Sequence, residues 1–185
     1  MGEQHKKHSR REHLNDFHLN VAGEYVYDGA LYACQNDDAK QRRSKRAVWG
    51  MAAILTVAVA AGGCIPAPGM QNCFYVLLPY LGEFLGAASV IWALAKLGTD
   101  WSTVREYNYK KSVAVLPVRT AVTAVFSGLG IVCELIFFFV NDHAGQTFFA
   151  LLYVLLKLTA LLSALVLRAE IMQTEWDKLP KKNNF

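Results

Sequence analysis

The sequence predicts an all-α integral membrane protein built from four transmembrane helices, with a short N-terminal extension in front of them. The chain is 54% hydrophobic, and its apolar residues concentrate in residues 47–168. The hydrocarbon layer of a bilayer is about 30 Å thick, so a helix needs about 20 mostly apolar residues to cross it. The segments that meet this requirement are residues 47–65, 74–95, 120–140 and 147–167.

The positive charges lie in alternate connecting segments along the chain, and so on one side of the predicted bundle. Apart from Lys157, every Lys and Arg lies in residues 1–46, 96–119 or 168–182, whereas the two short loops on the other side contain none. Cytoplasmic loops of membrane proteins carry an excess of Lys and Arg. The pattern therefore predicts that both termini lie in the cytoplasm. The same placement accounts for the net charge of +4 without a nucleic-acid partner.

The N-terminal extension, residues 1–46, contains a candidate β-hairpin. Residues 24–34 place Asp28-Gly29 between aromatic flanks, and this dipeptide favours a tight turn because both turn positions need positive φ. A lone two-stranded hairpin is marginal in water. The hairpin is therefore expected to dock on the membrane, the inner loop or another protein. The alternative is a disordered tail with an aromatic patch.

A polybasic segment, residues 40–46, comes directly before the first span. Its cations are Lys40, Arg42, Arg43, Lys45 and Arg46. Each Lys or Arg close to an anionic membrane surface contributes about 1 kcal/mol of attraction. We expect this segment to lie against the inner leaflet and to face lipid or a partner protein.

The other segments expected in the cytoplasm are the inner loop, residues 96–119, and the tail, residues 169–185. In the loop, Thr103 and Glu106 have the spacing of a capping box. Aromatic residues mixed with cations predict a short interfacial helix there, which would end at Pro117. The fourth helix is expected to continue into the tail as far as Pro180. The short outer loops make the first and second helices antiparallel neighbours, and likewise the third and fourth.

Three ionisable residues lie within the predicted spans: Glu83, Glu134 and Lys157. Each costs about 2.5–3.5 kcal/mol at a helix centre, so we expect them to face the bundle interior. At about 1.5 Å per residue, Glu83 and Lys157 both lie about 15 Å below the outer ends of their helices, and Glu134 lies about 9 Å below. The long Lys157 side chain can reach both glutamates, so we expect a buried Lys157 that is neutralised by one or both of them.

This charge cluster has two interpretations. Two carboxylates and one ammonium leave a surplus negative charge, which protonation of one glutamate would remove in a low dielectric. A group of that kind would couple proton or cation movement to transport. In the second interpretation the three residues form a polar network that fixes the packing of the helices.

Two cysteines, Cys64 and Cys73, flank the first outer loop. A disulfide between them on the oxidising side would join the ends of the first two helices. A thiol oxidoreductase would need a relay of accessible, reactive cysteines. The sequence has no Cys-x-x-Cys motif, and Cys34 and Cys133 are expected to be free thiols.

Nothing in the sequence indicates an enzyme, a cofactor or a metal site. The four N-terminal histidines, His5, His8, His13 and His18, do not all share one helical face and have no cysteine partner, so a solvated tail is expected. The sequence contains no glycine-rich phosphate loop, nucleophile elbow or zincin motif.

The sequence thus leaves three functional hypotheses. The first is a non-enzymatic accessory or scaffold subunit that binds a protein partner or anionic lipid through its cytoplasmic face. The second is a small transporter or channel-forming oligomer built around the charge cluster, and the third is a membrane thiol oxidoreductase. Expected partners are membrane lipids, another membrane or cytoplasmic protein, and further copies of the chain. Small size and the lack of sorting signals favour the cytoplasmic membrane of a bacterium.

Overall fold

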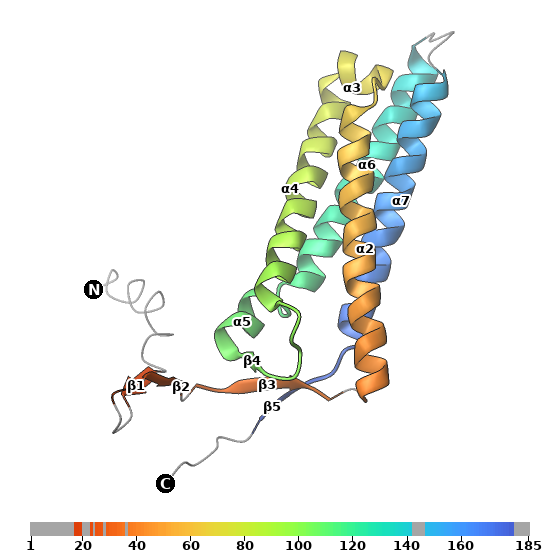
Figure 1. The fold of residues 1–185 in the computed structure, drawn as a ribbon. Coiled ribbons are helices and arrows are strands. Elements are labelled where there is room, and N and C mark those ends of the chain that lie inside the picture. The colour runs from red at the N-terminus through yellow and green to blue at the C-terminus, as the bar shows by residue number, and fades with distance from the viewer. Residues whose placement is uncertain are drawn as a thin grey trace, which may run out of the picture.

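Four long helices form a bundle, and a small β-sheet lies at one end of it (Figure 1). The computed structural model describes residues 17–19, 23, 25–27, 29–35, 37–141 and 147–179. The long helices are α2 (Asp38–Cys64), α4 (Phe74–Leu97), α6 (Leu116–Val140) and α7 (Thr147–Met172). The short helices are α3 (Pro68–Asn72) and α5 (Glu106–Lys111). The strands are β1 (Phe17–Leu19), β2 (Tyr25–Tyr27), β3 (Leu31–Cys34), β4 (Val104–Arg105) and β5 (Trp176–Lys178).

The four long helices coincide with the four predicted spans. Helix α2 begins at Asp38 rather than Ala47, because the Lys, Arg and Gln residues of the polybasic segment are good helix formers. Helix α6 begins at Leu116, with Pro117 in the first turn, where a proline is tolerated. Helices α2, α4 and α7 and the segment Glu106–Val140 are each long and apolar enough to cross a membrane. The fold is therefore compatible with a multi-pass membrane protein.

Buried positions recur along the long helices with alternating spacings of three and four residues. In α7 they include Ala150, Tyr153, Lys157, Ala160, Ala164, Leu167 and Ile171. In α6 they include Leu116, Thr120, Thr123, Ser127, Gly130, Glu134 and Phe137. A repeat of 3.5 residues keeps one stripe of each helix turned toward its neighbours, as in left-handed helical bundles.

Small residues bring the helices close together. Helix α6 packs against α4 and α7, and α7 also packs against α2, whereas the contact between α2 and α4 is smaller. A methyl group at Gly86 would lie 2.5 Å from Thr123 Oγ1, and one at Gly82 would lie 2.6 Å from the ring of Phe126. Because neither glycine carries a side chain, α4 can approach α6 closely.

Large apolar side chains cover the outside of the bundle, and its interior combines small and polar residues with apolar ones such as Leu55 and Leu94. The outward-facing side chains include Val57, Leu85, Phe139 and Leu151, which are 67%, 68%, 81% and 65% exposed. Fully buried residues include Ser127, Thr120, Glu83 and Glu134. A water-soluble domain buries its large apolar side chains, so this arrangement suits a bundle surrounded by lipid.

The strands pair differently from the predicted hairpin over residues 24–34. Strand β2 pairs with β1, and β3 pairs with β4 on one edge and β5 on the other. Strands therefore lie on both sides of the predicted turn but do not pair with each other; Asp28 is outside the described residues. The physical reason is that β3 gains two antiparallel ladders with the inner loop and the tail, where a hairpin would give it one.

The three-stranded sheet joins the N-terminal extension, the inner loop and the tail at one end of the bundle (Figure 1). Aromatic rings cover the contact: Tyr32 stacks on Tyr109 with ring centroids 4.2 Å apart, and Trp176 lies 5.8 Å from Trp101. Strand β3 precedes α2 and strand β5 follows α7. Their pairing therefore places the N-terminal extension and the tail at the same end of the bundle.

Two expectations for the inner loop and the tail are corrected. Helix α5 ends at Lys111 rather than near Pro117, and Thr103 does not cap it. Helix α7 ends at Met172 rather than near Pro180, because β5 forms and its neighbour Leu179 donates its N–H to the Leu31 carbonyl at 2.8 Å.

Candidate functional site

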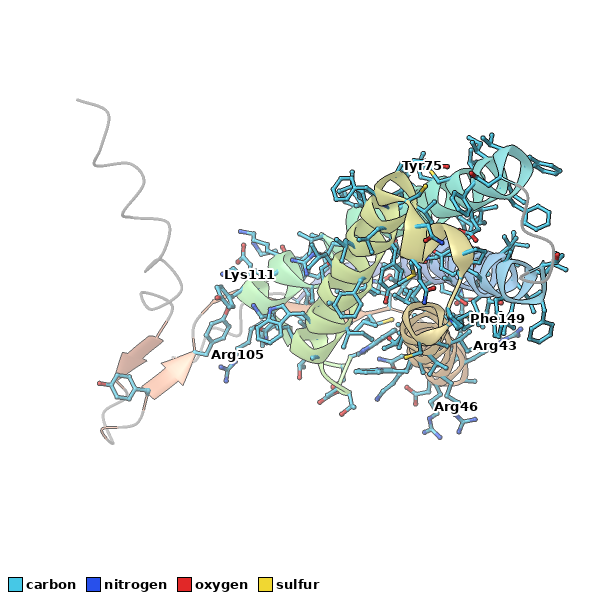
Figure 2. All side chains as sticks on the ribbon, turned by 90° about the horizontal axis from the view of Figure 1, so that it is seen from above. Arg43, Arg46, Tyr75, Arg105, Lys111 and Phe149 are labelled. Atoms are coloured by element: carbon cyan, nitrogen blue, oxygen red, sulfur yellow. The ribbon has the colours of Figure 1, made fainter. Side chains whose placement is uncertain are left out.

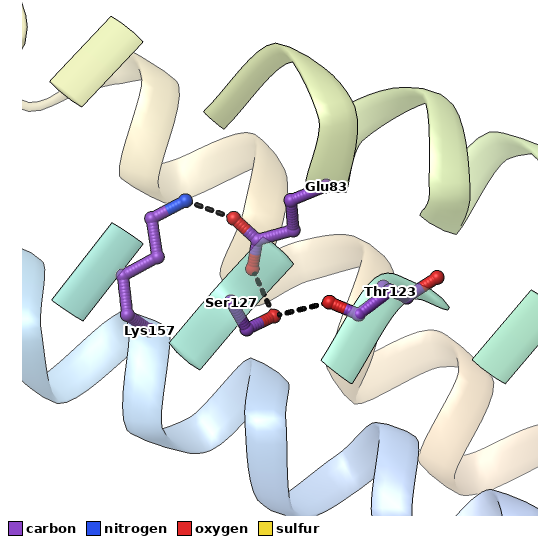
Figure 3. A network of polar contacts seen from close by, with 4 residues as sticks. All are labelled: Glu83, Thr123, Ser127 and Lys157. Atoms are coloured by element: carbon purple, nitrogen blue, oxygen red, sulfur yellow. Dashed lines mark hydrogen bonds and ion pairs between the residues drawn. The ribbon is translucent and has the colours of Figure 1, made fainter. Parts of the chain in front are cut away.

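The candidate site is an ion pair in the core of the bundle (Figure 3). Lys157 Nζ of α7 contacts Glu83 Oε2 of α4, and the two residues are 1% and 0% exposed. Each occupies a buried position near the middle of its helix. The structure thus brings together two of the three residues that sequence analysis placed in the charge cluster.

Ser127 of helix α6 completes the environment of Glu83. Ser127 Oγ lies 2.7 Å from Glu83 Oε1 and 3.0 Å from the carbonyl oxygen of Thr123 (Figure 3). A serine hydroxyl has a single proton to donate, so the carboxylate and the Thr123 carbonyl compete for it. The carboxylate is the stronger acceptor because it carries charge. Both oxygens of Glu83 therefore have a donor.

Two tyrosine rings surround the ammonium of Lys157. Its Nζ lies 4.5 Å from the ring centroid of Tyr80 and 4.9 Å from that of Tyr153. The faces of aromatic rings attract cations, more strongly when the cation is desolvated. A methyl group at Gly130 would lie 3.6 Å from Lys157 Cε, an ordinary van der Waals contact, so the lysine stem packs closely along α6.

Glu134 occupies a different environment from Glu83. Its Oε1 accepts a hydrogen bond from the backbone N–H of Gly69 in α3 at 3.4 Å, and its Oε2 has no hydrogen-bond partner. No ion pair joins Glu134 to Lys157 within the part of the chain that the structure describes. The predicted three-residue cluster is therefore a pair and a separate buried carboxyl group, because Lys157 is engaged by Glu83.

A short helix closes over Glu134. A methyl group at Gly69 would lie 2.2 Å from Glu134 Oε2 and 3.1 Å from Phe137 Cδ1, so a larger residue at that point of α3 would force the Glu134 carboxyl group to move. Glu134 and Tyr153 are each 0% exposed, and the Tyr153 hydroxyl also lacks a hydrogen-bond partner. Two buried polar atoms are thus left unsatisfied toward the α3 end of the core, whereas the Glu83 pair is satisfied.

Sequence reasoning missed the residues that surround the two acids and the lysine, namely Ser127, Tyr80 and Tyr153 at the ion pair and Gly69 at Glu134. One signal was present in the sequence. Polar and small residues follow the same 3.5-residue repeat along α6 as the ionisable Glu134 does, and such a stripe indicates the side of a membrane helix that faces other helices. The rings of Tyr80 and Tyr153 and the position of Gly69 could be found only from the fold.

The predicted disulfide between Cys64 and Cys73 is not present, and all four cysteines are free thiols. Helix α3 occupies the connection between the two residues. Cys64 is exposed at the end of α2, whereas Cys73 packs against an apolar cluster that includes Ala67 and Phe137. The two side chains thus lie in different surroundings.

The polybasic segment forms the first turns of α2. Lys40, Arg42, Arg43 and Arg46 are exposed and form no ion pair with a described residue, whereas Lys45 donates a hydrogen bond to the Thr99 carbonyl. The three arginines line an open recess together with Asp38 and Ala39. Figure 2 shows the Arg46 side chain extending away from the bundle.

The described residues contain no group of three or more His, Cys, Asp or Glu side chains that could hold a metal ion. Of the four N-terminal histidines, His18 lies in β1 opposite Val26 of β2, whereas His5, His8 and His13 lie outside the part of the chain that the structure describes.

Comparison with protein families, with curated proteins and with solved structures finds no match to this chain. The geometry of the chain itself is therefore the basis for proposing a function.

Proposed function

We propose that the protein is a non-enzymatic integral membrane protein that acts as an accessory or scaffold subunit. The observation that carries this proposal is the enclosure of the ion pair. Glu83 and Lys157 are 0% and 1% exposed, and Glu83 has a donor on each oxygen. An enclosed pair whose carboxylate is bonded on both oxygens, and whose ammonium lies between Glu83 and two tyrosine rings, suits a role in fixing helix packing.

The surface available for binding is the end of the bundle that carries the sheet. The positive-inside pattern favours a cytoplasmic location for this end. Here the N-terminal extension, the inner loop and the tail are tied by β3, and the exposed arginines of α2 lie beside them. A rigid platform with unpaired cations suits an anionic partner, either a protein with an acidic surface or an anionic lipid.

Affinity purification of the full chain in a mild detergent tests this function. We expect a protein partner or anionic lipid to co-purify in a fixed ratio, and to be lost from the Arg42→Gln/Arg43→Gln/Arg46→Gln variant. A chain that purifies with neither, from cells in which it is made at its natural level, would argue against an accessory role.

A transporter or channel is the second candidate function, and one observation favours it. Glu134 Oε2 and the Tyr153 hydroxyl are buried without partners, which is the situation expected of groups that take up a proton or cation. Proton flux in proteoliposomes would distinguish the two functions. A pH-dependent flux that Glu134→Gln or Glu83→Gln abolishes supports transport, and the absence of flux supports the accessory role.

The third hypothesis, a membrane thiol oxidoreductase, has no observation in its favour among the described residues, where the four cysteines are unpaired.

A further inference from the structure

Helix α2 presents an outward face unlike those of the other three long helices. The large apolar side chains that α2 exposes are Ile54 and Val57, whereas α4, α6 and α7 each expose many, from Phe74 in α4 to Met172 in α7. One set of exposed positions on α2 repeats every three or four residues: Arg46, Gly50, Ala53, Val57, Ala60 and Cys64. Between Arg46 and Cys64, Val57 is the one large apolar side chain of this stripe, and the others are small.

The basic recess continues this stripe at its lower end. Arg42, Arg43 and Arg46 line the recess, and all three are exposed without an ion pair to a described residue. The segment from Arg46 to Cys64 is about 27 Å long at the rise of an α-helix, close to the thickness of the hydrocarbon layer. If Cys64 lies at the outer boundary, Arg46 lies at the level of the inner headgroups.

We propose that α2 binds an anionic phospholipid of the inner leaflet, with the lipid phosphate held by the guanidinium groups of Arg42, Arg43 and Arg46. The acyl chains lie along the small residues from Gly50 to Ala60. Guanidinium groups recognise phosphate with paired hydrogen bonds. This inference rests on the proposed function and names the ligand of its basic surface.

Charge and shape favour this lipid over a second copy of the chain. A parallel pair of α2 helices would bring the same three arginines together, and like charges that face each other repel. A second helix would need side chains that fit around Val57, whereas a flexible acyl chain can adapt its shape to the small side chains beside it. A partner helix with acidic residues at its cytoplasmic end is a separate possibility, and the experiment below distinguishes it.

Native mass spectrometry of the full chain provides the test. The protein in mild detergent is mixed with equal amounts of phosphatidylglycerol and phosphatidylcholine, and the ratio of the two bound lipids is measured. We expect the wild type to prefer phosphatidylglycerol and Arg42→Gln/Arg43→Gln/Arg46→Gln to reduce that preference at least about tenfold. Arg42→Lys/Arg43→Lys/Arg46→Lys should keep part of the preference, because it retains charge but loses the paired geometry.

A matched control removes the same number of charges elsewhere at the same end. Lys96 lies over the Trp92 ring, Lys110 pairs with Glu106, and Lys111 bonds to Tyr107. Lys96→Gln/Lys110→Gln/Lys111→Gln should leave the lipid ratio unchanged. Equal losses in the two glutamine variants would show a general charge effect and overturn the inference.

Two further results would also overturn it. Displacement of the lipid by excess inorganic phosphate would show that the recess takes free phosphate rather than a lipid. A protein that co-purifies through the three arginines, with no change in the lipid ratio, would overturn the lipid assignment and leave the proposed function intact. If neither lipid nor protein depends on the arginines, both proposals fail.

Discussion

Glu83 and Glu134 are two carboxyl groups buried to the same extent in the same bundle, yet they differ in what surrounds them. Both are 0% exposed. Glu83 contacts Lys157 and Ser127, whereas Glu134 has one long hydrogen bond, 3.4 Å from the Gly69 nitrogen, and an oxygen without a partner. Burial alone therefore does not reveal the role of an intramembrane acid; its partners do.

The comparison leads to different expectations for the two groups. Removing a partner from Glu83 leaves an uncompensated charge in the core, which is strongly destabilising. Glu134 has no ion-pair partner among the described residues, and its surroundings suit a neutral group as well as a carboxyl group. The predictions below order the expected losses of unfolding free energy from the largest to the smallest.

Lys157→Ala should destabilise the bundle most, by about 3–5 kcal/mol, because it leaves the Glu83 carboxylate buried and unpaired. Denaturant titration of the protein in mixed micelles would measure the change. The double variant Glu83→Gln/Lys157→Met should recover much of the loss, since it removes both charges together. If the double variant is no more stable than the worse single variant, the two residues do not stabilise each other.

Gly69→Ala should destabilise the outer end by about 1–3 kcal/mol, because the new methyl group overpacks the site against Glu134 Oε2. Gly62→Ala is the matched control, since a methyl group there meets no atom within 4 Å. The same titration should show Gly62→Ala to be neutral or stabilising. Equal losses in the two variants would mean that α3 does not close over Glu134.

Ser127→Ala should cost about 0.6–1.5 kcal/mol through the lost hydrogen bond to Glu83. Ser163→Ala is a suitable control, because Ser163 is also buried but bonds only to the Thr159 carbonyl of its own helix. The difference between the two variants measures the contribution of the bond between helices. No difference would remove Ser127 from the site.

Glu134→Gln should have the smallest effect, below about 1 kcal/mol, because the amide can still accept the Gly69 hydrogen bond and no ion pair is broken. Glu83→Gln, which leaves Lys157 unpaired, should be clearly more damaging in the same titration. If the two glutamine variants are equally unstable, Glu134 shares the lysine, and the distinction between the two acids is wrong.

Much of this architecture could be predicted from the sequence because hydrophobic length and charge act locally along the chain. The predicted span 74–95 matches helix α4 to within two residues, and the span 47–65 coincides with the C-terminal two thirds of the longer helix α2. The rise of a helix placed Glu83 and Lys157 at the same level, and the two side chains are in contact. Properties that depend on a single stretch of sequence could therefore be predicted.

The remaining features depend on contacts between distant segments. The aromatic sequence around Tyr32 favours a strand but does not indicate its partners. Strand β3 pairs with β4 and β5 rather than with β2, and this pairing depends on the inner loop and the tail lying beside it in the fold. The engagement of Glu134 with Gly69 likewise depends on how α3 folds over the bundle end. Sequence spacing could place both glutamates within reach of Lys157 along the bundle axis, but it could not show which of them forms the ion pair.

The whole account depends on α2 crossing the membrane with its basic end in the cytoplasm, and site-specific labelling tests this directly. Two variants without other cysteines are compared, one that keeps Cys64 and one that carries Lys40→Cys; both positions are exposed. In sealed cells, a membrane-impermeant thiol reagent should modify Cys64, and it should reach position 40 only after the membrane is permeabilised. Modification of position 40 in sealed cells would contradict the account.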